Sequence, residues 1–106
     1  MFKKKANTEW SIERYVTELD GYHIMVQLSH GCNDGNIAGG TVSKMVMYPL
    51  SISGNKDIVV YDMGWRDGVP EDIKVRHIIE KIIHHFDNTY IDWEQEQRKG
   101  KLTAMV

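Results

Sequence analysis

The stretch that decides the fold is WSIERYVTELDGYHIMVQL, residues 10–28, in which two runs rich in β-branched and aromatic residues flank Asp20-Gly21. An Asp-Gly pair between two such runs is a strong hairpin signal, because both residues can adopt positive φ in a type I′ turn. The sequence therefore predicts an antiparallel hairpin. Pairing across its turn sets three cross-strand pairs: Leu19–Tyr22, Thr17–Ile24 and Tyr15–Val26.

The two faces of this hairpin differ in character, because residues that lie opposite each other on paired strands share a face. The first face is mostly apolar and is expected to form the core: Tyr15, Leu19, Tyr22, Ile24, Val26 and Leu28. The second face also carries more apolar residues than a solvent face usually has: Trp10, Ile12, Val16 and Met25. We expect another segment or a second chain to cover the second face.

Two further strands and a helix follow the hairpin. A glycine-rich loop leads into a third strand at residues 41–50, where Pro49 marks its end or an edge position. The fourth strand, residues 57–63, has a near-continuous apolar run that is typical of burial on both faces. Residues 71–86 have the apolar periodicity of a helix, and Pro70 near its start fits the N-terminal signature.

The fold class that these elements predict is α+β. A four-stranded antiparallel sheet in β-β-β-β-α order carries one helix packed on one face. The length suits a single domain over residues 1–106. It divides into a flexible lead-in (1–8), a core (9–88) and a C-terminal extension (89–106), with a short helix predicted at residues 90–99 and an apolar tail.

Composition excludes several classes of function. The net charge is −2, so no overall basic field indicates a nucleic-acid partner, and Lys3-Lys4-Lys5 is expected to be a solvated tail. The single cysteine, Cys32, fits a reducing compartment. The sequence shows no signal-peptide pattern and no apolar run of membrane-spanning length. We therefore expect a cytoplasmic protein with no membrane partner.

The stretch GNIAGGTVSK, residues 35–44, resembles a phosphate-gripping loop at first sight. A Walker-type loop needs lysine after its last glycine and a helix after that, whereas Gly40 is followed by Thr41 and a strand pattern. The glycines are better explained by a bend that needs positive φ, with an anion-binding nest of backbone N–H groups as the alternative.

No catalytic, metal or cofactor set is predicted. His77 and His84 lie two helical turns apart, about 10 Å along the axis, which is too far for one metal ion. His30 and Cys32 are near neighbours, but no third group that could orient them is identifiable. Carboxylates in the connection before the helix are expected to cap it.

Aromatic residues in the connections point instead to binding. Trp65-Arg66 falls in the connection after the fourth strand, and Trp93 lies in the polar segment DWEQEQ. Trp and Arg are common hot-spot residues of protein interfaces. The alternative is that Trp65 forms a lid over the edge of the core.

Two short motifs resemble those of a family of small uncharacterised proteins from Gram-positive bacteria and their phages, which carries a domain-of-unknown-function label. The first is GGTVSKM, residues 39–45, and the second is YDMGW, residues 61–65, where Met63 stands in place of an expected arginine. The resemblance covers about residues 20–88. It implies a mobile-element setting, in which small proteins often antagonise host defence.

The first hypothesis is a non-enzymatic phage or mobile-element binding protein that occupies a host protein or defence complex, like an anti-CRISPR inhibitor. The alternative is a small-molecule binder that sequesters a nucleotide-like signal, and a small enzyme that uses Cys32 or the acidic connection ranks third. The expected binding residues are Gly39, Gly40, Ser43, Lys44, Tyr61, Asp62, Trp65 and Arg66. A homodimer is also expected, with the interface residues Trp10, Ile12, Val16, Trp93, Leu102 and Met105.

Overall fold

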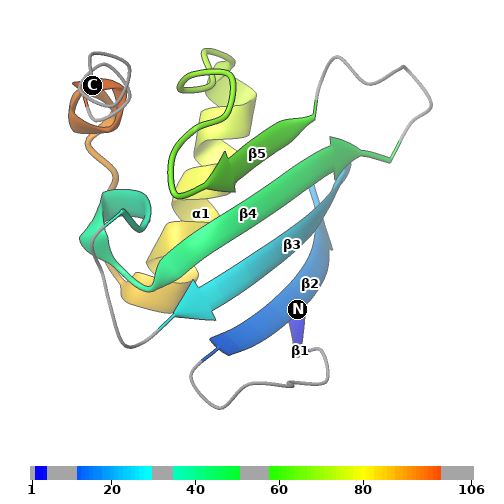
Figure 1. Cartoon of the computed structure of the whole chain (residues 1–106). Helices are drawn as coiled ribbons and strands as arrows, with labels where there is room; N and C mark the ends of the chain where they lie inside the picture. The colour runs from blue at the N-terminus through cyan, green and yellow to red at the C-terminus, as the bar shows by residue number, and fades with distance from the viewer. Residues whose placement is uncertain (1, 5–11, 30–34, 51–57, 99–106) are drawn as a thin grey trace.

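The computed structural model describes residues 2–4, 12–29, 35–50 and 58–98, and these carry one antiparallel sheet and one long helix (Figure 1). The strands are β1 (Lys3–Lys4), β2 (Ile12–Leu19), β3 (Tyr22–Ser29), β4 (Val42–Pro49) and β5 (Val59–Asp62), and the helix is α1 (Ile73–Asp87). Their order in the sheet is β1-β2-β3-β4-β5. The predicted α+β class, with four main antiparallel strands and a helix on one face, is confirmed.

The hairpin of β2 and β3 has the predicted turn and register. Asp20 and Gly21 both have positive φ, 51° and 88°, as a type I′ turn requires. The three predicted cross-strand pairs are present: Leu19–Tyr22, Thr17–Ile24 and Tyr15–Val26. The N–H of Leu50 donates to the carbonyl of Gly21 at 2.9 Å, so the end of β4 is also tied to this turn.

Residues 2–4, which fall within the predicted lead-in 1–8, lie against the domain. Lys3 and Lys4 form β1, which pairs with Val16 and Tyr15 of β2. The reason is Phe2, whose ring lies 4.6 Å from the His85 ring and 4.8 Å from the Phe86 ring of α1. This aromatic anchor holds the segment against the helix and brings the backbone beside β2.

Helix α1 begins and ends at residues that suit those positions. The carboxylate of Asp72 accepts the N–H of Lys74 at 2.8 Å, which satisfies an amide that has no partner within the helix. Asn88 ends the helix in the left-handed conformation. The helix therefore starts two residues later and ends one residue later than predicted, so that Pro70 lies before it. The prediction of a carboxylate cap is confirmed for Asp72.

The core lies between α1 and the facing side of the sheet. Five helix residues are buried there: Val75, Ile78, Ile79, Ile82 and Ile83. On the sheet side, the buried apolar residues include Ile24, Val26, Leu28, Val42, Met45, Met47 and Tyr61. Tyr15, Leu19 and Tyr22 pack against this core and are half-buried. The predicted core face of the hairpin is thus confirmed.

One prediction about β5 is wrong. Its apolar run suggested burial on both faces, but β5 is the last strand of the sheet and only its inner face meets the core. Tyr61 is buried, whereas Val60 is half-buried and Asp62 is exposed. The physical reason is that α1 covers one side of the sheet, so alternate residues of β5 point to a side that no described helix covers.

Candidate binding surface

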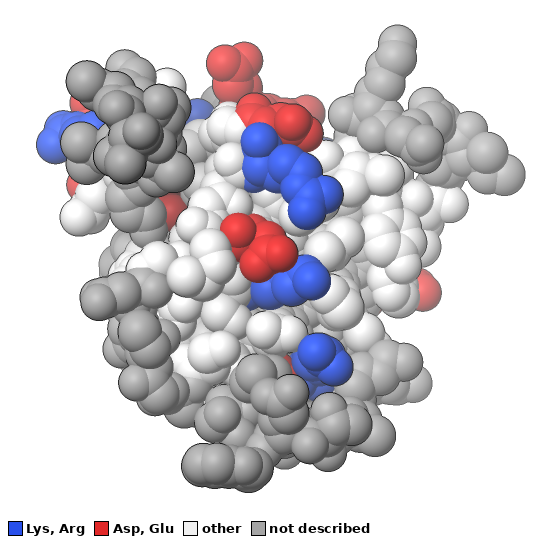
Figure 2. All heavy atoms as spheres, in the orientation of Figure 1, with Lys and Arg blue, Asp and Glu red and all other residues white. Residues whose placement is uncertain are grey.

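The sheet face turned away from α1 is the most distinctive surface of the described chain. In Figure 1, α1 lies behind the sheet, so that Figure 2, in the same orientation, looks onto this open face. The strand register aligns four of its side chains across β2, β3, β4 and β5: Val16, Met25, Val46 and Val60. All four are half-buried, and we call them the apolar row.

A second line of side chains, the charged row, runs beside the apolar row. It is formed by Arg14, Gln27, Lys44 and Asp62, again one residue from each strand. Arg14 Nε donates to Gln27 Oε1 at 3.2 Å. Figure 2 shows basic and acidic side chains as a band across this face, with uncharged surface next to it. The row is cationic on β2 and β4 and anionic on β5.

On the other side of the apolar row lies an aromatic pair. The rings of His23 and Tyr48 are directly opposite each other on β3 and β4, with their centroids 5.0 Å apart. Tyr48 is 43% exposed, and Ile58, which precedes β5, is 38% exposed. An apolar centre between polar and aromatic margins is typical of protein-binding surfaces, which enrich aromatic residues and place polar groups at the rim.

A β-bulge places Lys44 on this face. The register pairs Leu28 with Val42 but Gln27 with Lys44, so Ser43 is an extra residue in β4. The Ser43 hydroxyl is 3.3 Å from the carbonyl of Gln27, to which it donates. The bulge lets Val42 and Met45 both face the core while Lys44 faces outward, which explains how this serine shapes the surface although it is itself buried.

The structure separates the predicted binding residues into two groups. Lys44 and Asp62 are cross-strand neighbours in the charged row, and Arg66 is exposed beside β5, where its N–H donates to the carbonyl of Val60 at 3.0 Å. The remaining residues, apart from Ser43 at the bulge, belong to the turn and the core on the side of α1: Gly39, Gly40, Tyr61 and Trp65. They do not share one surface with the charged row.

The glycine-rich turn does bind anions, but they are carboxylates of the chain itself. The N–H of Ala38 donates to Glu96 at 3.2 Å, and the N–H of Thr41 donates to Asp87 at 3.1 Å. Between them, the amides of Gly39 and Gly40 donate to carbonyls within the turn. Since these four consecutive amides are engaged, we do not propose a nucleotide-like ligand at this turn.

Trp65 is a lid over the core edge. Its ring packs edge-on against Tyr61 at 4.9 Å, and its Nε1 donates to Glu96 Oε1 at 3.1 Å. The hydroxyl of Tyr61 donates to the carbonyl of Gly35. Burial raises the pKa of the Tyr61 phenol well above its ordinary value, and the negative charge of Glu96 raises it further. This cluster closes the end of the core between the sheet and the C-terminal residues.

Trp93, a predicted interface residue, is engaged within the chain. Residues 93–98 are helical, which agrees with the short helix predicted at residues 90–99. Trp93 Nε1 donates to Glu80 at 3.0 Å, and the guanidinium of Arg76 lies 5.1 Å from its ring centroid. Half-buried and partnered in this way, Trp93 holds the short helix against α1.

Glu96 is the residue that the sequence reading missed. It is only 2% exposed and joins the turn at Ala38 to the ring of Trp65. Its segment looks solvated because charged and amide residues surround it. The spacing in the sequence could have indicated this burial, because Trp93 and Glu96 are three residues apart and lie on one face of a helix.

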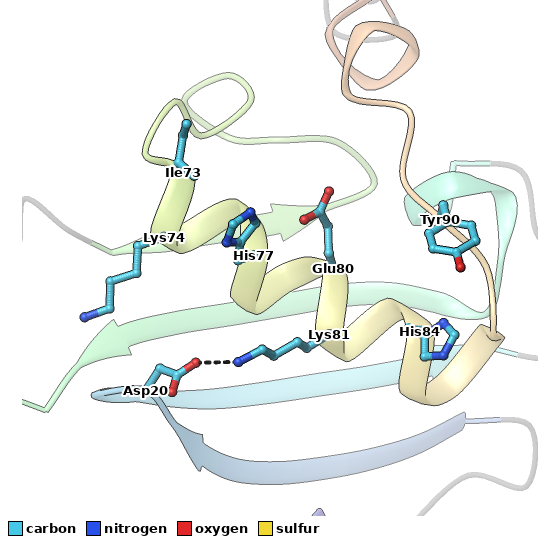
Figure 3. Close-up of a pocket in the computed structure, with 8 residues that line it drawn as sticks. All are labelled: Asp20, Ile73, Lys74, His77, Glu80, Lys81, His84 and Tyr90. Atoms are coloured by element: carbon cyan, nitrogen blue, oxygen red, sulfur yellow. Dashed lines mark hydrogen bonds and ion pairs between the residues drawn. The ribbon is translucent and has the colours of Figure 1, made fainter.

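A groove of about 680 Å³ runs along the outer side of α1 (Figure 3). Figure 3 shows the helix side chains of this groove pointing in different directions, with Asp20 at the β2–β3 turn and Tyr90 on the segment after α1. Of its two carboxylates, Asp20 pairs with Lys81 at 3.0 Å and Glu80 accepts from Trp93. Within the described ranges, no group of three or more His, Cys, Asp or Glu side chains is placed to hold a metal ion.

Several predicted residues cannot be placed. Trp10, His30, Cys32, Leu102 and Met105 lie outside the described residues, as does the side chain of Ile12. Val16 is the one predicted interface residue whose described side chain lies on the open face.

The fold and this surface define a small α+β protein in which a helix covers one face of the sheet and none of the described helices covers the other. A family model described as "Domain of unknown function (DUF7678)" matches residues 9–87, and the chain belongs to this family. No curated protein and no solved structure matches the chain. In the part of the chain that the structure describes, no helix has the length and apolar character needed to cross a membrane.

Proposed function

We propose that this protein is a non-enzymatic binding protein that acts by occupying the surface of a partner protein, and that the open sheet face is its binding surface. The apolar row is the observation that carries this proposal. Val16, Met25, Val46 and Val60 form a line across four strands and remain partly exposed to solvent. A central apolar strip within a polar rim matches the composition of protein interfaces.

The partner in this proposal is a host protein or defence complex in the bacterial cytoplasm, and the protein acts as an anti-CRISPR-like antagonist. The motif resemblance to proteins of Gram-positive bacteria and their phages supports this setting. The charged row adds specificity, because charges beside an apolar contact penalise partners whose own charges do not match.

A quantitative capture experiment with a bacterial host lysate tests the proposal. The tagged protein is compared with Met25→Glu, which places a charge in the middle of the apolar row, and with Tyr90→Ala as the matched control. Tyr90 is 86% exposed and lies at the groove along α1, on the other side of the molecule. Circular dichroism confirms that each variant is folded before it is used.

We expect one host protein to be retained by the wild type and by Tyr90→Ala and lost with Met25→Glu. With that protein purified, Met25→Glu should weaken the dissociation constant at least tenfold, because an ionised group would be buried without a partner. Equal capture by Met25→Glu and the wild type would rule out the open face as the binding surface. Loss of capture with Tyr90→Ala would indicate that the partner binds at the groove along α1.

A further inference from the structure

We propose that the open face also binds a second copy of this chain, as a face-to-face homodimer whose two-fold axis runs parallel to the strands between β3 and β4. The inference shares with the proposed function the premise that the open face binds protein. It adds that the chain is its own first partner and that a host partner must compete with this dimer.

The charged row supplies the main argument, because it is complementary to itself under this rotation. The rotation places β2 opposite β5 of the partner and β3 opposite β4 of the partner. Each row of side chains then faces the same row of the partner. Arg14 then meets the partner's Asp62, and Gln27 meets the partner's Lys44. By symmetry each of these contacts occurs twice.

The remaining rows are compatible with the same arrangement. In the apolar row, Val16 meets the partner's Val60 and Met25 meets the partner's Val46, so that each apolar side chain is covered by another. In the row of the aromatic pair, His23 meets the partner's Tyr48, while Glu18 lies opposite the partner's Ile58 at the margin of the contact and gains no charged partner. Aligned packing of two sheets about 10 Å apart is a common arrangement and leaves room for interdigitated side chains.

Other two-fold arrangements of the same faces fit less well. An axis across the strands sets Arg14 opposite Glu18 of the partner, but it leaves Asp62 above the partner's Ile58 and Lys44 above its Tyr48. A two-fold axis that runs diagonally to the strands makes the strands of the two sheets cross at right angles, and both such axes set like charges against each other. One of them places Arg14 opposite the partner's Arg14 and Asp62 opposite the partner's Glu18. The other diagonal axis places Asp62 opposite the partner's Asp62.

The size of the face predicts the strength of the dimer. Four strands at a spacing of about 4.8 Å and a strand length of about 20–25 Å give roughly 400–500 Å² on each copy. That lies near the lower limit for specific interfaces, at about 1,000 Å² in total. We therefore expect a reversible dimer with a dissociation constant in the micromolar range, which a tighter-binding host partner can displace.

Charge reversal with rescue between chains is the decisive experiment. Arg14→Glu faces the partner's Asp62, and Asp62→Arg faces the partner's Arg14, so each variant alone creates two like-charge contacts. When the two variants are mixed, the mixed dimer has an opposite-charge pair at both positions. Within one chain, positions 14 and 62 lie on β2 and β5, roughly 14 Å apart across the sheet, so an internal contact cannot explain the rescue.

Sedimentation velocity over a micromolar concentration series measures these states, and fluorescence transfer between labelled variants detects mixed dimers. We expect the wild type to dimerise, each charge reversal to raise the dissociation constant at least tenfold, and the mixture to recover wild-type association. The control Lys74→Glu makes the same change in net charge as Arg14→Glu, at an exposed position on α1, and should dimerise like the wild type.

Four outcomes would overturn the inference. They are a wild-type chain that stays monomeric at high micromolar concentration even after truncation at Lys99, a dimer that ignores both charge reversals, no recovery in the mixture, and a wild-type monomer that dimerises only after truncation at Lys99. The last outcome would mean that the C-terminal tail covers the face within one chain. A monomer whose host partner is still lost with Met25→Glu would refute the dimer and leave the proposed function intact. A dimer that captures no host protein would support the dimer and refute the proposed function.

Discussion

The carboxylate of Asp87, the last residue of α1, accepts both the backbone N–H and the hydroxyl of Thr41, at 3.1 and 2.5 Å, across 46 residues of sequence. This contact joins the C-terminal end of the helix to the residue that precedes β4. It therefore fixes how the helix lies across the inner face of the sheet.

Asp87→Ala should lower the free energy of unfolding by about 1–3 kcal/mol, since it leaves the Thr41 amide without its acceptor. Urea denaturation of the two proteins measures the difference. Asp67→Ala is the control, because Asp67 is exposed in the connection after β5 and should change stability by less than about 0.5 kcal/mol. Similar losses for the two variants would show that the Asp87–Thr41 contact contributes nothing specific.

Gly40→Ala should be destabilising because of Asp87. A Cβ added to Gly40 would lie 2.2 Å from Asp87 Oδ2, and the φ of this glycine is negative, so the steric contact is the cause. A double-mutant cycle tests this, since Gly40→Ala should cost much less in the Asp87→Ala background. We expect a coupling of about 1 kcal/mol or more in unfolding free energy. Strict additivity would contradict the explanation.

Trp65→Ala should affect stability and leave partner binding unchanged. It removes a ring that packs on Tyr61 and leaves the buried carboxylate of Glu96 with one donor fewer, so we expect a loss of about 2–4 kcal/mol. Trp65→Phe retains the ring and removes only the donor, and should lose about 1 kcal/mol. An unchanged melting temperature for Trp65→Ala, together with lost binding, would restore the hot-spot hypothesis.

Gly21→Val should cost about 1–2 kcal/mol, because a β-branched residue resists the positive φ of this turn. A Cβ at this position meets no atom within 4 Å, so the cost is conformational and not steric. Gly21→Asn is the matched control, since asparagine tolerates the left-handed region and should lose less. If both variants lose the same amount, backbone conformation is not the reason.

Tyr61 should make the protein sensitive to alkali. Its pKa is raised in the folded state, whereas a tyrosine in the unfolded chain has a pKa of about 10. Above that pH the unfolded state releases a proton that the folded state keeps, so stability falls as pH rises. Between about pH 11 and pH 12, the wild type should lose about 1.4 kcal/mol per pH unit more than Tyr61→Phe. Parallel pH profiles would contradict this assignment.

The local elements could be predicted from the sequence where a short pattern determines them. Asp20-Gly21 specified the turn and with it the whole register of β2 and β3, and the spacing of the isoleucines specified the buried side of α1. These features depend on residues that are close together in the chain, so a periodicity or a pair of turn residues is sufficient.

The links between distant segments could not be predicted in the same way. The partners of the glycine-rich turn, Asp87 and Glu96, come from the end of α1 and from the following short helix. Nothing in residues 35–44 shows that an internal carboxylate would meet its amides. Likewise, Trp65 and Trp93 looked exposed in polar segments, and only tertiary packing turns them toward the core.

Because each strand pairs with its neighbours in the sequence, the sheet has consequences for the kinetics of folding. The two-residue turn between β2 and β3 closes with little loss of entropy, and proteins rich in local contacts fold quickly. The hairpin of β2 and β3 should form within microseconds, whereas the Asp87–Thr41 contact must wait until the helix has docked. We therefore expect Asp87→Ala mainly to accelerate unfolding and Gly21→Val mainly to slow folding, which would place the transition state at the hairpin.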